Sequence, residues 1–182
     1  MEILRGRTVI LKTVEYNDIE QIRKIRNSEE IGRHFIFREK ITPQQQVDWF
    51  HRISESKDDY FFSIYLENKL IGLTEIKKIN WKQRTGEGGI FIIPEYQNSY
   101  NSFETSILSL DYAFNRLKLK KILSTVMKSN KRAIKYNKVF GFKEYDKYEQ
   151  IIDDKKEEIV LLEVTVDNYI KSRQKISNLL GI

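Results

Sequence analysis

One segment of the chain joins a strand to a helix through a loop of small polar residues. Residues 90–102 read Ile-Phe-Ile-Ile-Pro-Glu-Tyr-Gln-Asn-Ser-Tyr-Asn-Ser. The first N–H groups of a helix have no partner within the helix, and they lie at the positive end of its dipole. The segment therefore predicts a phosphate site where the loop enters the helix. An ordinary strand-to-helix connection has the same pattern, and the local sequence alone favours that interpretation.

A second segment, residues 130–142, begins with a good helix cap and ends at a glycine. Asn130 can accept a hydrogen bond from the first turn of a helix, and Gly141 can end that helix. Helix formation alone explains both residues. The two segments are separated in the chain by one expected helix and one expected strand. Their occurrence together at this spacing favours a shared site.

The residue types exclude several kinds of chemistry. The chain has no cysteine, which rules out disulfides, a thiol nucleophile and thiolate metal sites. Its two histidines, His34 and His51, are too few for a multi-histidine metal site, so we expect no metal. We expect both histidines to be surface or packing residues.

Length and composition favour a single domain over residues 1–182. A chain of 182 residues with 40% hydrophobic residues can bury a layered core. The net charge of +6 favours an anionic partner: nucleic acid, a phosphorylated cofactor or an acidic membrane surface. No apolar run approaches the ~20 residues of a membrane span. We expect no signal peptide, because the first residues, 1–7, are charged and few. We therefore expect a cytoplasmic protein.

Hydrophobic periodicity predicts a mixed α/β domain built on one sheet. Expected helices, several with clear caps, cover residues 18–31, 42–53, 100–114, 131–140 and 167–180. Expected strands cover residues 4–11, 60–66, 70–79, 86–93, 121–127, 142–152 and 157–165.

These segments together resemble the GNAT superfamily of N-acetyltransferases over nearly the whole chain. In that family a strand ending in a hydrophobic residue and Pro leads into an Arg/Gln-x-x-Gly-x-Gly/Ala loop. Here Gln97 takes the first position, while Tyr100 and Ser102 stand where the family prefers glycine. The resemblance implies a central, twisted, mostly antiparallel sheet of about seven strands flanked by helices.

The resemblance extends to a later Asn-x-x-Ala/Ser segment that ends in Gly-Phe, here Asn130 to Phe142, and to the opening Leu4-x-Gly6-x-x-Val9. It implies acetyl-CoA as co-substrate. Loop amides would hold the pyrophosphate, and strand N–H groups would hold the acetyl carbonyl and pantetheine. The basic residues that flank Asn130 would face the 3′-phosphate: Lys128, Lys131, Arg132 and Lys135. The implied cofactor-binding residues are Ile92, Ile93, Gln97, Asn98, Ser99, Tyr100, Asn101, Ser102, Phe103, Asn130, Ala133 and Lys135.

Direct acetyl transfer to an amine needs a general base and a proton donor for the leaving thiolate. By the resemblance, Glu87 is the first choice of base and Glu75 the second, with solvated strand carboxylates as the alternative interpretation. Many family members carry a tyrosine acid seven residues after the motif asparagine. Here Asn137 occupies that position and Tyr136 precedes it, so Tyr136 is either the acid or a core residue.

The acceptor is expected near the first helices. Residues 25–31 resemble the branch that includes the pseudaminic-acid-pathway acetyltransferase, which acts on a nucleotide-linked 4-amino sugar, and also ribosomal-protein N-acetyltransferases. The implied substrate-binding residues are Arg26, Asn27 and Trp49.

The main functional hypothesis is therefore acetylation of an amino sugar nucleotide. The alternatives are a protein N-terminus or a polyamine as acceptor, or a non-catalytic acyl-CoA- or nucleic-acid-binding protein. For the enzyme we expect a small-molecule amine as partner, no nucleic acid and no membrane, with a homodimer suggested by the family.

Overall fold

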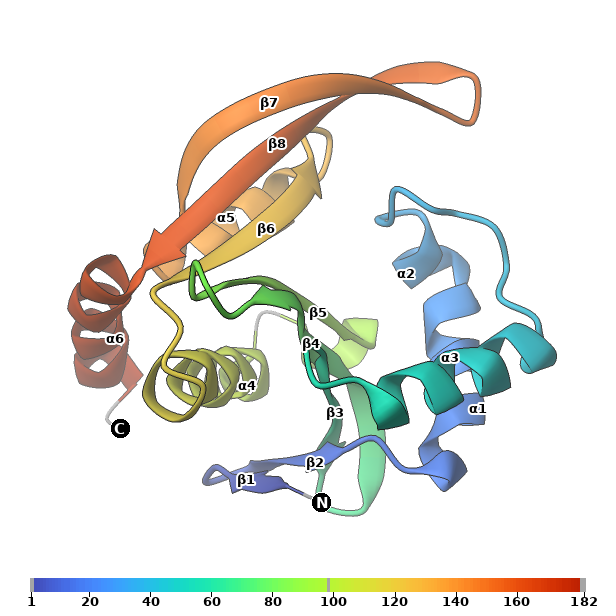
Figure 1. The fold of residues 1–182 in the computed structure, drawn as a ribbon, viewed down its shortest axis with the longest axis horizontal. Coiled ribbons are helices and arrows are strands. Elements are labelled where there is room, and N and C mark those ends of the chain that lie inside the picture. Colours follow the sequence, from blue (N-terminus) through green and yellow to red (C-terminus); the bar gives the residue numbers. More distant parts are fainter. Residues whose placement is uncertain (1, 98, 181–182) are drawn as a thin grey trace.

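The computed structural model describes residues 2–97 and 99–180 (Figure 1). Within them, eight strands form one sheet in the order β1-β2-β3-β4-β5-β6-β8-β7. Neighbouring strands are antiparallel except β5 and β6, which are parallel. The strands are β1 (Ile3–Arg5), β2 (Val9–Thr13), β3 (Tyr60–Leu66), β4 (Lys69–Asn80), β5 (Thr85–Ile92), β6 (Lys121–Met127), β7 (Lys143–Ile152) and β8 (Lys155–Thr165). This sheet confirms the predicted α/β fold.

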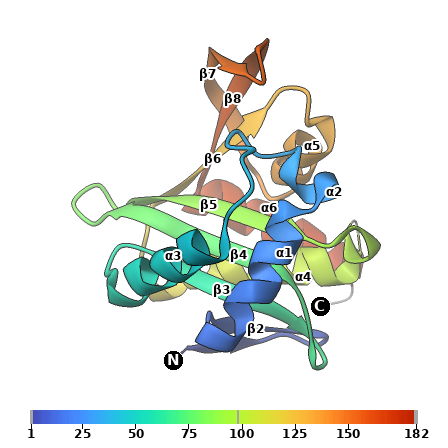
Figure 2. The same cartoon turned by 90° about the vertical axis from the view of Figure 1, so that its right-hand side faces the viewer.

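Helices cover both faces of the sheet. They are α1 (Ile19–Asn27), α2 (Glu29–Gly32), α3 (Pro43–Glu55), α4 (Tyr100–Asp111), α5 (Lys131–Val139) and α6 (Val166–Leu180). Figure 2 shows α1 and α3 in front of β3–β5, with α4 behind them. The core accordingly has two main clusters, one around α4 and α6 and one beneath α1 and α3.

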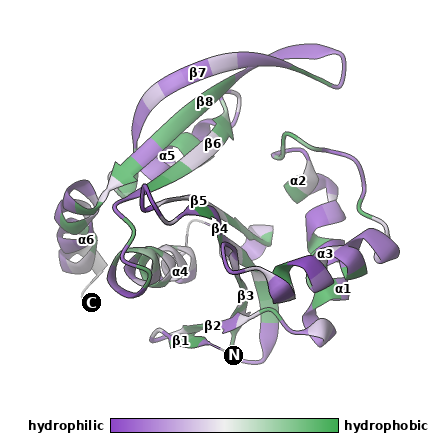
Figure 3. Ribbon diagram, in the orientation of Figure 1, coloured by the Kyte–Doolittle hydropathy of each residue, from purple (hydrophilic) through white to green (hydrophobic). Residues whose placement is uncertain are grey.

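The last two strands differ sharply in exposure. Most residues of β7 are solvent-exposed, whereas β8 is exposed at its start and mostly buried or half-buried after that. Figure 3 shows this as a hydrophilic β7 beside a hydrophobic β8. This hairpin extends beyond the helices (Figure 1).

Local sequence signals set several helix ends as predicted. Thr42 accepts the N–H of Gln45 at 3.2 Å, and the Gln45 side chain accepts the N–H of Thr42 at 2.8 Å, so both halves of a capping box form around Pro43. Gly141 follows α5 with φ of +89°, the left-handed conformation expected of a helix stop.

Three elements differ from the sequence prediction. The first expected strand is two strands joined by a turn, which gives eight strands in place of about seven. The first helix breaks at Ser28, whose backbone is extended and whose hydroxyl donates to Ile25 O at 2.8 Å. After Asp111, α4 continues as a π-helical turn, Tyr112–Arg116.

Among the described residues, no helix is both long enough and apolar enough to cross a membrane.

Candidate active site

The sheet opens where β5 meets β6. The two strands pair only through Thr85–Glu87 and Lys121–Leu123, after which they diverge. A cavity of about 880 Å³ lies in and beside this opening, and its walls come from both strands and from α4 and α5. The loop after α2 and the helix α3 also contribute to its wall. The divergence therefore creates room for a ligand in the middle of the sheet.

The free edge of β5 presents backbone donors to this opening. Ile93 N–H donates to Ile71 O at 2.9 Å, so it is used within the sheet. Successive N–H groups of a strand point to opposite edges, so Ile92 N–H points away from β4, towards the opening. The Gln97 side chain donates to Ile92 O at 2.6 Å and fixes the exit of the strand. Of the two predicted strand amides, the structure thus places that of Ile92 at the opening.

The N-terminus of α4 also reaches the cavity. Ser99 caps the helix through its backbone: its carbonyl accepts Ser102 N–H at 3.1 Å and Ser102 Oγ–H at 2.9 Å. Ser102 and Gln97 line the cavity. The preceding first-turn N–H groups, those of Tyr100 and Asn101, are left as donors by helix geometry. Ser102 therefore replaces glycine without closing this end.

The other residues of the loop serve the packing of α4. The Asn101 side-chain oxygen lies 2.8 Å from Thr8 Oγ, and Phe103 packs against the rings of Tyr136 on α5 and Phe140 just after it. The Tyr100 hydroxyl is buried without a hydrogen-bond partner in the described structure. Asn98, also predicted to bind the cofactor, lies outside the described residues.

The start of α5 forms the opposite wall. Asn130 Oδ1 accepts the N–H of Ala133 at 3.1 Å, which confirms the predicted cap. Both residues line the cavity. Lys135 is exposed on α5 and is not among the lining residues.

The Tyr136 hydroxyl is turned into the contact between α4 and α5. It donates to Ser102 O at 2.6 Å and lies 2.7 Å from Ser106 Oγ. Burial raises the pKa of Tyr136, which makes its proton harder to release. Asn137 donates to Ala133 O at 2.9 Å. Both side chains line the cavity, but the Tyr136 hydroxyl and the Asn137 amide N–H are already used in helix contacts.

The two predicted bases lie together on the cavity wall. The Glu87 carboxylate pairs with Lys78 Nζ at 3.0 Å, and Glu75 forms an ion pair with Lys77. The side chain of Glu87 is 33% exposed and that of Glu75 is 20% exposed, so water and ligand can reach both. Their position suits contact with a cationic amine.

The predicted acceptor residues are divided between two places. Trp49 packs edge-on against Phe61 at 5.3 Å and lines the cavity. Arg26 is 7% exposed, lies 3.7 Å over the Phe35 ring and donates to Phe37 O. Arg26 and Asn27 line a separate cavity of about 370 Å³. The structure thus brings Trp49, but not Arg26 or Asn27, to the main cavity.

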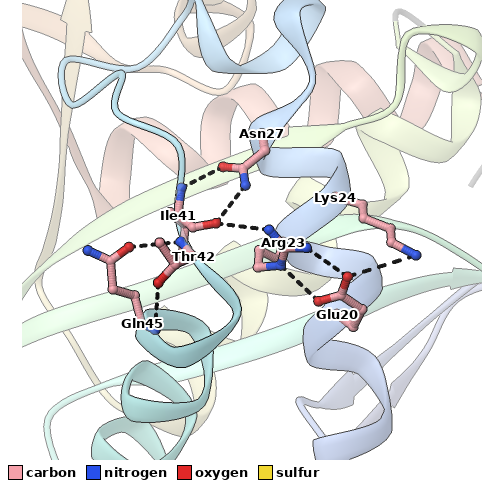
Figure 4. Close-up of polar contacts among 7 residues, drawn as sticks. All are labelled: Glu20, Arg23, Lys24, Asn27, Ile41, Thr42 and Gln45. Atoms are coloured by element: carbon pink, nitrogen blue, oxygen red, sulfur yellow. Dashed lines mark hydrogen bonds and ion pairs between the residues drawn. The ribbon is translucent and has the colours of Figure 1, made fainter.

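Asn27 has a clear structural task. Its side chain donates to Ile41 O at 2.8 Å and accepts Ile41 N–H at 2.9 Å, while Arg23 donates to the same carbonyl at 3.0 Å (Figure 4). These contacts tie the loop between α2 and α3 to α1. That loop contributes His34 and Phe35 to the cavity wall, so Asn27 supports the wall from behind.

Four charged residues on the wall were not singled out from the sequence: Asp59, Lys77, Lys78 and Arg52. Arg132, which the sequence placed near the cofactor 3′-phosphate, also lines the cavity. The alternation of β4 could have suggested Lys77, because it lies two residues from Glu75 and therefore on the same face. Asp59 and Arg52 come from other parts of the chain, which a single sequence does not bring together, and Lys78 reaches the wall through an irregularity in β4.

These features define a class of protein. Strand amides, a helix N-terminus and the polar residues Gln97, Ser102 and Asn130 suit the pyrophosphate and amide-rich arm of an acyl-CoA. Carboxylates on the adjoining wall suit an amine. The cavity therefore fits an acyl thioester and an amine acceptor together.

Comparison with known proteins identifies the family. A family model described as an acetyltransferase (GNAT) domain matches residues 8–143. The chain belongs to this family, and the enzyme is an acetyl-CoA-dependent N-acetyltransferase. Among the described residues, no group of three or more His, Asp or Glu side chains could hold a metal ion.

The individual relatives share less than a third of their residues with this chain. Spermidine N(1)-acetyltransferase of Escherichia coli K12 is 26% identical over 135 residues, which cover 74% of this chain and 73% of that protein. The Vibrio cholerae enzyme of the same name is 28% identical over 138 residues, covering 74% and 78%. A crystal structure of spermidine N-acetyltransferase from Vibrio cholerae with CoA and spermine has a TM-score of 0.83 at 22% identity, covering 91% of this chain and 99% of that one. These relatives do not support the amino-sugar and ribosomal-protein branches expected from residues 25–31.

Proposed function

We propose that this enzyme transfers the acetyl group of acetyl-CoA to a primary amine of a polyamine. The observation that carries the proposal is the pair of carboxylates, Glu75 and Glu87, on the cavity wall. The relatives named as spermidine acetyltransferases support the same acceptor class. This was the alternative acceptor in the sequence analysis, and it replaces the amino sugar as the preferred one.

Acetyl-CoA supplies an activated acetyl group on a thioester, and the chain must position it and deprotonate the acceptor. We assign the base to Glu87: a carboxylate oxygen takes a proton from the acceptor ammonium, and the free amine then attacks the thioester carbonyl carbon. The C–N bond forms as the C–S bond breaks, and the departing thiolate takes the second proton that the amine nitrogen loses. Glu75 holds the acceptor by charge. The Ile92 N–H is assigned to the acetyl carbonyl, and Asn130 and Ser102 to the cofactor arm and phosphates.

Tyr136 is given a positioning role. Its proton is already donated to Ser102 O, so service as an acid would require breaking that hydrogen bond. It holds the N-terminal part of α4 against α5, and through it the proposed phosphate site. Tyr136→Phe is therefore expected to weaken acetyl-CoA binding more than it lowers the maximal rate.

The acceptor is tested by thiol release from acetyl-CoA in the presence of single amines. Spermidine should give CoA and an acetylspermidine that mass spectrometry identifies. A nucleotide-linked 4-amino sugar and an N-terminal peptide serve as the competing acceptors. Release with either of these but not with spermidine contradicts the proposal.

The base is tested by Glu87→Gln. Loss of a general base lowers the rate by about 10²–10⁴-fold, so we expect a fall of at least about a hundredfold in kcat, with acetyl-CoA affinity unchanged. The matched control is Glu163→Gln, because Glu163 is also a strand glutamate paired with a lysine, at 2.6 Å, and lies outside the cavity lining. Unchanged turnover in Glu87→Gln would remove Glu87 from this role.

We also propose that the enzyme self-associates. One structural relative from Vibrio cholerae is described as a dodecamer, which extends the expectation of a homodimer to larger assemblies. Light scattering after size exclusion measures the state directly.

A further inference from the structure

The acidic groups of the acceptor wall already have cationic partners within the chain. Lys77 pairs with Glu75, and Lys78 pairs with Glu87 at 3.0 Å. Taking polyamine acetylation as the proposed function, we propose that Lys77 and Lys78 determine acceptor specificity: they occupy the carboxylates that acceptor ammonium groups would use, and so select against acceptors of high charge.

The sheet register places these groups on one face. Lys77 lies opposite Glu87, and Glu75 lies opposite Gly89. Glu75 and Glu87 are therefore diagonal neighbours on adjacent strands, a relation that separates side-chain positions by about 7–8 Å. The Glu75 carboxylate lies over Gly89, where a Cβ atom would come within 2.7 Å of its oxygen. Two carboxylates at this spacing can each take one ammonium group of an extended polyamine.

Lys78 reaches the same wall because of an irregularity in β4. The register with β5 shifts between Lys77 and Asn80, and Lys78 has φ of +52°. A lysine in the left-handed conformation is strained and persists only when its surroundings fix it. Here Asp59 accepts Lys78 N–H at 2.8 Å, and Asp58 O accepts the next N–H, that of Ile79, at 3.0 Å. The bulge therefore places a second cation beside the first, which a regular strand would turn to the other face.

The other charged residues of the cavity lining also disfavour acceptors of high positive charge. Its cations are Arg52, Lys77, Lys78 and Arg132, against the carboxylates of Asp59, Glu75 and Glu87. His34 adds no charge at neutral pH, because burial, and then the positive charges of Arg33, Arg132 and Arg38, lower its pKa. The lining thus has a slight positive excess, and each further ammonium group on an acceptor must displace or approach a cation.

The proposal predicts that removing the lysines favours acceptors in proportion to their charge. We would titrate butylamine, putrescine, spermidine and spermine into the CoA-bound protein by calorimetry. In the double variant Lys77→Gln/Lys78→Gln, spermine should bind about tenfold more tightly, which corresponds to ~1.4 kcal/mol. The gain should decrease through spermidine and putrescine and vanish for butylamine. Lys78→Gly relieves the backbone strain and provides a second variant at that position.

Lys121→Gln is the matched control, because Lys121 is also a strand lysine with a side chain 34% exposed, paired with a glutamate at 2.6 Å. It should leave every affinity unchanged. The proposal is overturned if the double variant binds all four amines more tightly by the same factor, or if its affinities are unchanged or weaker. It is overturned as well if no polyamine binds to any form of the protein. It is also overturned if the variants lose CoA affinity, because the lysines would then be cofactor contacts. Binding with the predicted trend but without acetylated product would instead refute the proposed function alone.

Discussion

Glu104 joins the helix of the phosphate site to the first hairpin, and its removal should destabilise the protein strongly. Its carboxylate accepts the N–H groups of Arg7 at 2.5 Å, Thr8 at 2.9 Å and Val9 at 3.0 Å, and the Thr8 hydroxyl at 2.7 Å. Glu104 is 5% exposed. Gly6 lies so close that a Cβ atom there would come within 2.5 Å of the carboxyl carbon. The Leu4-x-Gly6-x-x-Val9 pattern is thus explained by this side chain: Gly6 leaves room for the carboxylate, and the residues after it donate their N–H groups to it.

The magnitude follows from the donors that lose their acceptor. The Val9 N–H is buried and would be left unsatisfied in Glu104→Ala, at about 1–3 kcal/mol. Arg7 and Thr8 are exposed, so water can replace the carboxylate as acceptor there. Each of these two hydrogen bonds then costs about 1 kcal/mol when it is lost. The expected loss is about 3–5 kcal/mol in the free energy of unfolding, measured by urea denaturation. Glu149→Ala is the control, because Glu149 forms an exposed pair with Lys156 and should lose under about 0.5 kcal/mol.

The same carboxylate makes stability depend on pH. Burial alone would raise the pKa of Glu104, but the hydrogen bonds from Thr8, Arg7 and Val9 outweigh it and hold the pKa below its ordinary value. The unfolded chain then binds the proton more tightly. This stabilisation is therefore complete above the ordinary glutamate pKa of the unfolded chain and is lost as the pH falls through the lower pKa of the folded state. The difference between wild type and Glu104→Gln should shrink as the pH falls from neutrality into that range. An equal difference at all pH values, or a loss under 1 kcal/mol for Glu104→Ala, would refute the reasoning.

Two further substitutions test the supports of the site. Asn27→Ala removes both hydrogen bonds to Ile41, so we expect a higher KM for the amine and a loss of about 1–2 kcal/mol, with steady-state kinetics and urea denaturation as the measurements; an unchanged KM would show that the loop does not need this tie. Gly141→Ala places a Cβ atom 2.7 Å from Asn168 O at a φ of +89°, so calorimetry should show a loss of about 2–3 kcal/mol, and a smaller loss than 1 kcal/mol would contradict the strain argument.

Sequence patterns predicted most of the fold because they are local. The Thr42 capping box, the Asn130 cap and the glycine stop at 141 all act within one helical turn, and all were confirmed. The break at Ser28 was missed because a serine within a helical pattern can continue the helix or bond to its own backbone.

The residues of the candidate active site were harder to predict from local sequence patterns than the fold. A family pattern could be transferred to Gln97 and Asn130 because these positions follow strand and helix ends. The pairing of Lys78 with Glu87 depends on a one-residue bulge, which alternation along β4 does not predict. The burial of Arg26 depends on Phe35 and Phe37, in a loop without periodicity.

The short pairing between β5 and β6 also has a consequence for folding. The strands before it, β1 to β5, pair in chain order, and β6, β8 and β7 form a second set. Three residue pairs join the two sets across the sheet. We expect the two sets to open as partly separate units, because backbone pairing between them is limited to these residues, although the core around α4 draws side chains from both. A ligand that spans the opening touches both units, so acetyl-CoA should slow amide hydrogen exchange in β8, none of whose described residues line the cavity, as well as at its own binding site.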